Sequence, residues 1–301
     1  MTWMQGFDRH ALTLTESTAC VRTAGVRGKP TLVLLHGFPQ THAMWHRVAQ
    51  ALAQDFFLVM PDLRGYGDSH LLPGTPEHPD HSQHSKRAMA ADVVAALDAL
   101  GVDRFFLCGH DRGGRVAHRL ALDFADRVQG LCVIDIAPTL DMYARTDMDF
   151  ARAYYHWFHL IQPAPLPETM IGGNAEAYLM HKLGGWGTGG TAHIEAEALA
   201  DYRRCFCRPE AIHSACEDYR ASADIDLEHD RESRAAGQKI ACPTLVLWGN
   251  RGVVQRLFDP LALWQAQCAV PVSGEALPAG HFIPEELPET TAWALRDFFT
   301  P

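Results

Sequence analysis

The pattern around which the chain is organised is Gly-x-Asp-x-Gly, with Asp111 at its centre between Gly109 and Gly113. The apolar run at 105–108 predicts a buried strand before it, and the apolar spacing after 114 predicts a helix behind it. Such an abrupt strand-to-helix turn holds the central side chain in a strained backbone conformation, which requires small flanking residues. The pattern is that of a nucleophile elbow carrying aspartate, whose charge the helix N-terminus favours. The alternative is an ordinary surface aspartate in a glycine-rich turn.

Two further residues could complete a catalytic triad with this aspartate. His281 follows Gly280 in a late loop, which fits the chain order nucleophile, acid, base. Asp135 interrupts the end of an apolar strand, where a buried carboxylate is costly unless it is paired. It either braces the following turn or orients a catalytic histidine. Asp259 is an alternative acid, and Asp123 is expected on the surface of the elbow helix.

A backbone hydrogen-bond donor is expected after the apolar run at 31–35. That run ends in His36-Gly37-Phe38-Pro39, and the N–H of Phe38 lies where a donor to an oxyanion could sit. Taken alone, the segment is only a strand-ending turn. The elbow later in the chain favours the functional interpretation.

The elements that must position these residues alternate between strands and helices. Continuous apolar runs are typical of strands buried on both faces of a parallel sheet, so we predict an α/β fold with a mostly parallel sheet. The strands are expected at 7–14, 18–24, 31–35, 56–60, 105–108, 128–136, 243–249 and 270–275. Besides the elbow helix, helices are expected at 42–53, 85–100, 260–267 and 284–299.

The alternation stops between 139 and 240. That stretch has a helical pattern, is rich in aromatic and charged residues, and contains a glycine-rich loop at 184–190. We interpret 139–240 as a helical cap domain inserted into a core domain formed by 1–138 and 241–301.

Composition argues against several classes of partner. The formal net charge of −10 disfavours nucleic acid and anionic membranes, although a local pair of arginines can still bind a small anion. No apolar run approaches the roughly 20 residues that span a bilayer, and the N-terminal residues lack the features of a signal peptide. The eight cysteines show no disulfide framework and indicate reduced thiols in a cytoplasmic protein. No metal site is expected.

The segments 36–39, 109–114 and 280–282 together resemble the Asp-nucleophile branch of the α/β-hydrolases, and the resemblance extends over essentially the whole chain. That branch contains haloalkane dehalogenases, epoxide hydrolases and haloacetate dehalogenases. The resemblance implies an α/β-hydrolase core with a mostly parallel eight-stranded sheet and an inserted helical cap. It also implies a triad with Asp111 as nucleophile and Asp135 as acid, a homodimeric assembly, and no cofactor.

Two arginines distinguish among these enzymes. Epoxide hydrolases usually carry Trp after the nucleophile, whereas this chain has Arg112, with Arg115 three positions later. Both project from the first turn of one helix, and a planar guanidinium matches a carboxylate in geometry. The pair resembles the carboxylate clamp of the fluoroacetate dehalogenases. Arg115 could instead pair with Asp123 or Asp126, but Arg112 has no such helical partner, and two adjacent like charges require an anion between them.

In the cap, His156, Trp157 and Tyr219 resemble the halide-binding trio of the same family. Each could donate a hydrogen bond to a departing halide. The alternative is that these residues are ordinary aromatic packing between cap and core. A further alternative is an epoxide hydrolase, whose two cap tyrosines could come from Tyr154, Tyr155 and Tyr219.

The resemblance therefore implies hydrolytic dehalogenation of haloacetates, with fluoroacetate converted to glycolate and fluoride. A small anionic haloacid would bind Arg112 and Arg115 while Asp111 displaces the halide and becomes an ester. His281 would then activate water, which attacks the ester, and the backbone N–H groups of Phe38 and Arg112 would hold the oxyanion. An epoxide hydrolase would use the same triad.

Overall fold

The computed structural model describes residues 3–76 and 78–300, and its centre is a single sheet. The strands are β1 (Asp8–Thr13), β2 (Ser17–Gly25), β3 (Thr31–Leu35), β4 (Phe57–Pro61), β5 (His70–Leu71), β6 (Phe105–His110), β7 (Val128–Ile134), β8 (Thr244–Gly249) and β9 (Val272–Leu277). Their order is β1-β2-β4-β3-β6-β7-β8-β9, with β5 beside β2. Neighbours from β4 to β9 are parallel, and β2 pairs antiparallel with β1, β4 and β5. The predicted α/β fold with a mostly parallel sheet is confirmed, and β5 is an additional short strand.

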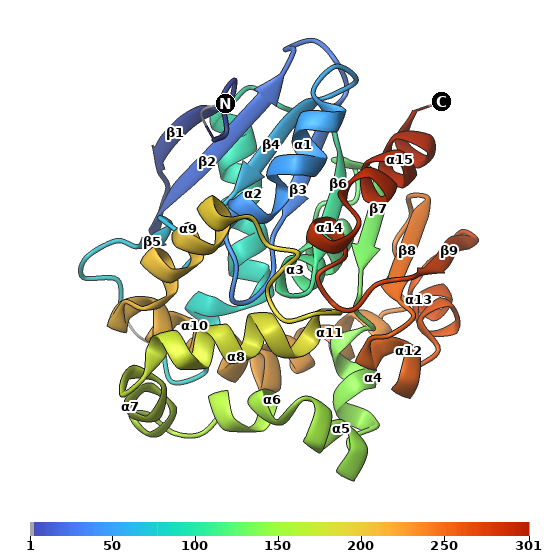
Figure 1. Ribbon diagram of the computed structural model, residues 1–301. Coiled ribbons are helices and arrows are strands. Elements are labelled where there is room, and N and C mark those ends of the chain that lie inside the picture. The colour runs from blue at the N-terminus through green and yellow to red at the C-terminus, as the bar shows by residue number, and fades with distance from the viewer. Residues whose placement is uncertain (1–2, 77, 301) are drawn as a thin grey trace.

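Helices cover both faces of this sheet, with α1 and α15 on one side and α2 and α3 on the other (Figure 1). The central strands β3, β4 and β8 are almost wholly buried, because both of their faces pack against helices. The helices outside the segment between β7 and β8 are α1 (His46–Leu52), α2 (Lys86–Ala99), α3 (Arg112–Asp123), α12 (Val253–Leu257), α13 (Pro260–Gln267), α14 (Ile283–Glu286) and α15 (Pro288–Phe299), with 3-10 helices η1 (His42–Trp45) and η2 (Ser82–His84).

Most predicted elements differ from the structure by one or two residues at their ends, and three differ for a clear structural reason. The helix expected at 42–53 begins as η1 and continues as α1. The helix expected at 284–299 is divided into α14 and α15 at Pro288, which has no backbone N–H and is suited to starting a new helix. The strand expected at 128–136 stops at Ile134, because Asp135 adopts a φ of 50° that a strand cannot continue.

Between β7 and β8 the described chain forms helices instead of further sheet strands. They are α4 (Thr139–Ala144), α5 (Met148–Ala153), α6 (Tyr155–Leu160), α7 (Leu166–Gly172), α8 (Ala175–Trp186), α9 (Ala196–Phe206), α10 (Pro209–Ala223) and α11 (Ile225–Ala235). Figure 1 shows these helices together across the end of the sheet at which β7 leads into α4. We call them the helical insertion; the division into a core of 1–138 and 241–301 and a cap of 139–240 stays a prediction.

Within residues 3–76 and 78–300, no helix is long and apolar enough to cross a membrane.

Candidate active site

The elbow predicted around Asp111 is present as an abrupt turn between β6 and α3. Asp111 has φ 46° and ψ −115°, in the positive-φ region that side chains rarely adopt. The flanking glycines are required by close backbone packing. A Cβ on Gly109 would lie 2.4 Å from the carbonyl oxygen of Gly113, and a Cβ on Gly113 would lie 2.4 Å from that of His36. The strain is therefore maintained by the packing of β6 and α3 against the loop after β3.

The loop after β3 brings a backbone donor to the aspartate. The N–H of Phe38 donates to Oδ2 of Asp111 at 3.0 Å. This approach needs glycine at position 37, because a Cβ there would meet the Cβ of Asp111 at 2.6 Å. One carboxylate oxygen is thus held by one of the two predicted oxyanion donors. The N–H of the other, Arg112, is the first of helix α3, which follows the aspartate directly.

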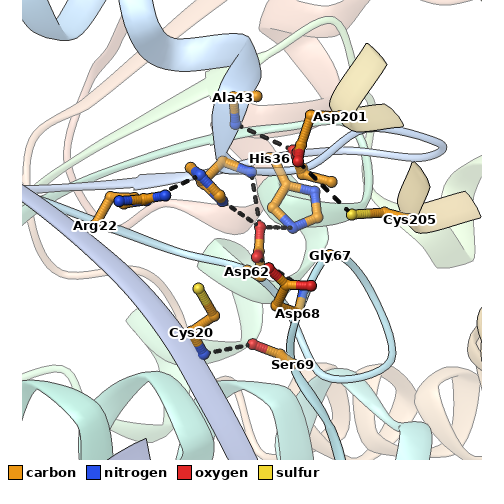
Figure 2. A network of polar contacts seen from close by, with 12 residues as sticks. Cys20, Arg22, His36, Ala43, Asp62, Gly67, Asp68, Ser69, Asp201 and Cys205 are labelled. Carbon is orange, nitrogen blue, oxygen red and sulfur yellow. Dashed lines mark hydrogen bonds and ion pairs between the residues drawn. The ribbon is translucent and has the colours of Figure 1, made fainter. Parts of the chain in front are cut away.

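A buried polar network connects this loop to the loop after β4 (Figure 2). His36 accepts a hydrogen bond from the N–H of Leu63 at 2.9 Å, and its ring lies 3.9 Å from Oδ1 of Asp62. Asp62 also accepts from the backbone N–H and the ring of His42, each at 2.8 Å. Burial would raise the pKa of Asp62, yet His42 and His36 hold it well below its usual value. The loops after β3 and β4 are therefore joined by a charged hydrogen-bonded network directly beside the Phe38 donor.

His281 and Asp135 form the predicted pair. Nδ1 of His281 lies 2.6 Å from Oδ2 of Asp135, and the N–H of Gly249 donates to Oδ1 at 3.0 Å. Burial would lower the pKa of His281, but the hydrogen bond and charge of Asp135 raise it above its usual value. The alternative acid, Asp259, is exposed and caps α13 by accepting from the N–H of Ala262 at 3.1 Å. Of the two candidate acids, Asp135 is the one that contacts the histidine.

The electrostatic surroundings keep Asp111 ionised. Burial would raise the pKa of its carboxyl, but the nearby positive groups, His281 first, lower it below its usual value. His110 also faces His281, with ring centroids 4.6 Å apart, and its Nε2 lies 2.8 Å from the carbonyl oxygen of His281. Burial lowers the pKa of His110 to about 3, so the ring is neutral and donates to that carbonyl. His110 was not predicted, because the sequence motif leaves its position unspecified.

The environment of Arg112 corrects one premise of the sequence analysis. The guanidinium already has a carboxylate partner, since Nε and Nη2 donate to the two carboxylate oxygens of Asp218 at 2.8 and 2.7 Å. Asp218 also pairs with Lys86 and accepts from the hydroxyl of Tyr66 at 2.6 Å. The inference that only a bound anion could balance the two arginines was therefore wrong. Asp218 could not be found from the sequence, because it lies 106 residues away in α10 and belongs to no motif.

Both arginines nevertheless retain one buried N–H group without a hydrogen-bond partner among the described residues. These groups are Nη1 of Arg112 and Nε of Arg115. Nη1 of Arg115 donates to Oγ1 of Thr139 at 2.8 Å and to the carbonyl oxygen of Ala137 at 3.2 Å. Neither Asp123 nor Asp126 pairs with Arg115 in the described structure, and Asp123 pairs with other arginines. A ligand carboxylate could therefore satisfy the two free N–H groups.

The three residues of the helical insertion that were predicted to bind halide lie together and are buried. Tyr219 lies beneath the guanidinium of Arg112, 4.1 Å from ring centroid to Cζ, and Trp157 lies beneath that of Arg115 at 4.7 Å. The ring centroid of His156 lies 5.6 Å from that of Tyr219. Burial lowers the pKa of His156 far below its usual value, so the ring is neutral. Nδ1 of His156 and the hydroxyl of Tyr219 have no hydrogen-bond partner among the described residues.

No group of three or more His, Cys, Asp or Glu side chains in the described chain has the geometry to hold a metal ion.

Comparison with known proteins extends this picture. Residues 30–286 match the family model described as the alpha/beta hydrolase fold. The chain is 43% identical over 297 residues to a fluoroacetate dehalogenase from Burkholderia sp, covering 98% of this chain and 95% of that protein. It is 34% identical to a soluble epoxide hydrolase from Corynebacterium sp. (strain C12), covering 93% of this chain and 92% of that protein. A crystal structure from Nostoc sp PCC 7120, grouped with the alpha/beta hydrolases, is 51% identical, with a TM-score of 0.93 and 98% of each chain covered.

Proposed function

Because the chain belongs to the α/β-hydrolase fold family, we propose that it hydrolyses the carbon–halogen bond of small haloacids, with haloacetates as the substrate class. The observation that carries this proposal is a set of buried polar atoms without partners among the described residues, namely N–H groups of Arg112 and Arg115, a ring nitrogen of His156 and the hydroxyl of Tyr219. Unpartnered buried donors are costly, and a small anion would satisfy them. The 43% identity to a fluoroacetate dehalogenase supports the same substrate class.

In the first step, the substrate carboxylate binds the free N–H groups of Arg112 and Arg115. Asp111 attacks the α-carbon with Oδ1, since the Phe38 N–H holds Oδ2. The carbon–halogen bond breaks, and its electron pair leaves with the halide while an ester forms on Asp111. The departing halide carries a concentrated negative charge, which the buried side chains His156, Trp157 and Tyr219 would stabilise.

In the second step, His281 takes a proton from water and the hydroxide attacks the ester carbonyl on Asp111. The electron pair displaced from that carbonyl collects on Oδ2, next to the N–H of Phe38. When the intermediate collapses, the bond between the Asp111 carbonyl carbon and Oδ1 breaks, and Oδ1 leaves as the alkoxide oxygen of the product, which takes a proton from the imidazolium of His281 to give the hydroxyacid. The acid formed on Asp111 loses its proton to solvent, which restores the carboxylate. Asp135 orients the imidazole and stabilises the imidazolium ion.

The second candidate function is epoxide hydrolysis by the same triad. Tyr154 favours it, because this buried tyrosine lies next to His156, with ring centroids 5.3 Å apart. The phenols of Tyr154 and Tyr219 could then protonate an epoxide oxygen. Similarity to the Corynebacterium epoxide hydrolase supports this candidate. Arg112 is the residue that argues against it, since the single oxygen of an epoxide would be occupied by the two phenols and would leave the free N–H group of Arg112 unpaired.

Halide release separates the two candidates. The purified protein is incubated with fluoroacetate, chloroacetate and an uncharged epoxide such as styrene oxide, and both halide and diol are measured. The proposal predicts halide and glycolate from the haloacetates and no diol. Diol formation without halide release would support the epoxide hydrolase and overturn the proposal. The expected homodimer and cytoplasmic location remain predictions.

A further inference from the structure

A second basic region lies outside the substrate site, in a cavity of about 340 Å³ between α5, α8 and α12. Its lining includes Arg152 from α5, Lys182 from α8, Arg256 from α12, and Arg251 from the loop after β8. No Asp or Glu is among the described residues that line it. In a chain with a net charge of −10, this concentration of positive charge is not explained by overall composition. We call this cavity the vestibule.

Lys182 is the inner cation of the vestibule and has an unusual environment. The residue is only 1% exposed, and its ammonium lies against aromatic rings, 3.7 Å from the centroid of Tyr155 and 5.0 Å from that of Trp186. It forms no ion pair with any described residue. Burial lowers the pKa of its ammonium to about 7. A buried cation held only by ring faces is incompletely compensated, and an anion beside it would supply the missing charge.

The wall of the vestibule is also a wall of the substrate site. His281 lines the vestibule directly. Trp186, another lining residue, lies 4.5 Å from His156 and 5.5 Å from His281 between ring centroids. Tyr154 lines the vestibule as well and stacks on Trp157 at 5.8 Å. An anion in the vestibule is therefore separated from the halide-binding residues by single aromatic side chains, which could rotate to admit it.

We propose that the vestibule is a capture site for carboxylate anions, from which they pass to Arg112 and Arg115. The exposed Arg152, Arg251 and Arg256 attract the anion from solvent, and the buried Lys182 holds it beside His281. The proposal rests on the proposed function, since a haloacid is the carboxylate to be captured. The arginines act at a distance, so their contribution belongs to the capture step and not to the chemistry.

The outer boundary of the vestibule limits how strong the attraction can be. Asp149 lines the adjoining surface hollow together with Arg152 and Arg256. One carboxylate beside three arginines and a lysine leaves the region positive. Exposed charges of this kind act over about 30 Å at 0.01 M salt and about 3 Å at 1 M salt, so the capture should depend strongly on ionic strength.

The kinetic test compares two triple variants of equal net charge. The vestibule variant is R152Q/R251Q/R256Q. The control is K29Q/R104Q/K239Q. These three exposed residues precede β3, β6 and β8, so they lie near the amino-terminal ends of the strands, whereas Asp111 follows the carboxyl-terminal end of β6. For fluoride release from fluoroacetate, we expect kcat/KM of the vestibule variant to fall about tenfold at low salt, with kcat unchanged within twofold. The difference from wild type should close at high salt. An equal loss in the control, or none in the vestibule variant, would overturn the proposal.

A binding measurement keeps this test independent of turnover. Sodium acetate, which has no leaving group, and acetamide, its uncharged analogue, are titrated into the full-length protein while tryptophan fluorescence is followed; Trp186 lies in the vestibule wall. We expect acetate, but not acetamide, to bind several-fold more weakly to the vestibule variant and to K182Q than to wild type or the control. Equal acetate affinity in all four proteins would contradict the capture site. If wild type releases no fluoride, the proposed function fails, and the acetate titration alone decides on the vestibule.

Discussion

At the scale of single residues, the site combines an ionised nucleophile with an uncharged histidine among the residues proposed to bind halide. The positive groups around Asp111 keep its pKa below the usual value, while burial keeps His156 uncharged. These are the protonation states that nucleophilic displacement and hydrogen bonding to halide require. His281 is the exception, because Asp135 raises its pKa, and it must be neutral to accept a proton from water.

The Asp135–His281 pair leads to a prediction about pH. As the imidazole must be neutral, activity should rise with pH along a limb set by the raised pKa of His281. In Asp135→Asn the charge that raises this pKa is lost, so the limb should move to lower pH. The plateau rate should also fall, by about 10³- to 10⁴-fold, because the ring loses its orientation. The measurement is the pH profile of kcat for halide release.

Asp259→Asn is the matched control for this prediction, since Asp259 is exposed and contacts the start of α13 rather than the histidine. Its profile should coincide with that of wild type. A displaced limb in the control, or an unmoved limb in Asp135→Asn, would show that another group sets the pH dependence.

The sequence was most informative at this scale where a residue stands in a local motif. Asp111 and its glycines follow from the geometry of a strand-to-helix turn, and Asp135 follows from the cost of an unpaired carboxylate in an apolar strand. Asp218 and Lys86 could not be predicted, because the contacts of Asp218 with Arg112 and with Lys86 exist only once α10 has packed against α2. A buried ion pair between elements that are far apart in the sequence produces no periodic pattern of residues.

At the scale of elements, the loop after β3 and the elbow must approach each other closely. Gly37→Ala would place a Cβ 2.6 Å from the Cβ of Asp111 and displace either the nucleophile or the Phe38 donor. A displacement of this order costs about 10²-fold in rate. We expect kcat to fall by about that factor while circular dichroism remains native. Gly172→Ala in α7, where an added Cβ meets nothing within 4 Å, should leave the rate unchanged. Equal rates in the two variants would contradict the proposed close approach.

Helix α3 is joined to the helical insertion by two buried ion pairs, and they should have different functions. Arg112 pairs with Asp218 of α10, and Arg119 pairs with Asp230 of α11, both at 2.7 Å. Removing one partner of a buried pair costs about 3–5 kcal/mol of unfolding free energy. We expect both Asp218→Asn and Asp230→Asn to lower stability, measured by denaturant unfolding. Only Asp218→Asn should raise KM for the haloacid, because Arg112 is proposed to bind the substrate carboxylate and Arg119 is not.

A raised KM in Asp230→Asn as well would indicate a general loosening of α3 rather than positioning of Arg112. An unchanged KM in Asp218→Asn would mean that the guanidinium is held correctly without its carboxylate. Either result would remove Asp218 from the account of substrate binding.

At the scale of the whole molecule, the sheet and the helical insertion meet at a buried carboxyl group. Glu285 of α14 accepts from the hydroxyl of Tyr202 in α9 at 2.8 Å and from the side-chain amide of Gln40 at 2.5 Å. Burial raises the pKa of Glu285 from 4.5 to about 8. The carboxyl is therefore protonated in the folded protein at neutral pH, although it would be ionised in the unfolded chain.

The stability of the protein should therefore depend on pH, because the folded and unfolded states bind different numbers of protons at Glu285. Below pH 4.5 both states carry the proton; between 4.5 and about 8 only the folded state keeps it, so stability should decrease as pH rises through this interval. The contribution of one proton is at most about 1.4 kcal/mol per pH unit. Glu285→Gln should flatten this slope in denaturant unfolding at several pH values. Glu289→Gln, an exposed position on α15, should leave it intact, and an unaltered slope in Glu285→Gln would contradict the protonated carboxyl.

The order of strands and helices could be predicted from the sequence, whereas the contacts between the sheet and the helical insertion could not. Alternating apolar runs specify which segments enter the sheet, and the loss of that alternation after β7 marks the helical insertion. The pattern does not specify how the insertion lies on the sheet, because that depends on long-range pairs such as Tyr202 with Glu285. The vestibule was not predicted for the same reason: its cations come from three separate segments that converge only in the folded protein.

Mass spectrometry can detect the ester that Asp111 is proposed to form with the substrate. His281→Phe is incubated with chloroacetate, and the peptide bearing Asp111 is analysed after digestion. The ester should form but not be hydrolysed, so the peptide should gain one carboxymethyl group, with a single equivalent of chloride released per active site. The same variant carrying Asp111→Asn should release no chloride and show no added mass. Continuing chloride release with an unmodified Asp111 peptide would contradict covalent catalysis by this aspartate.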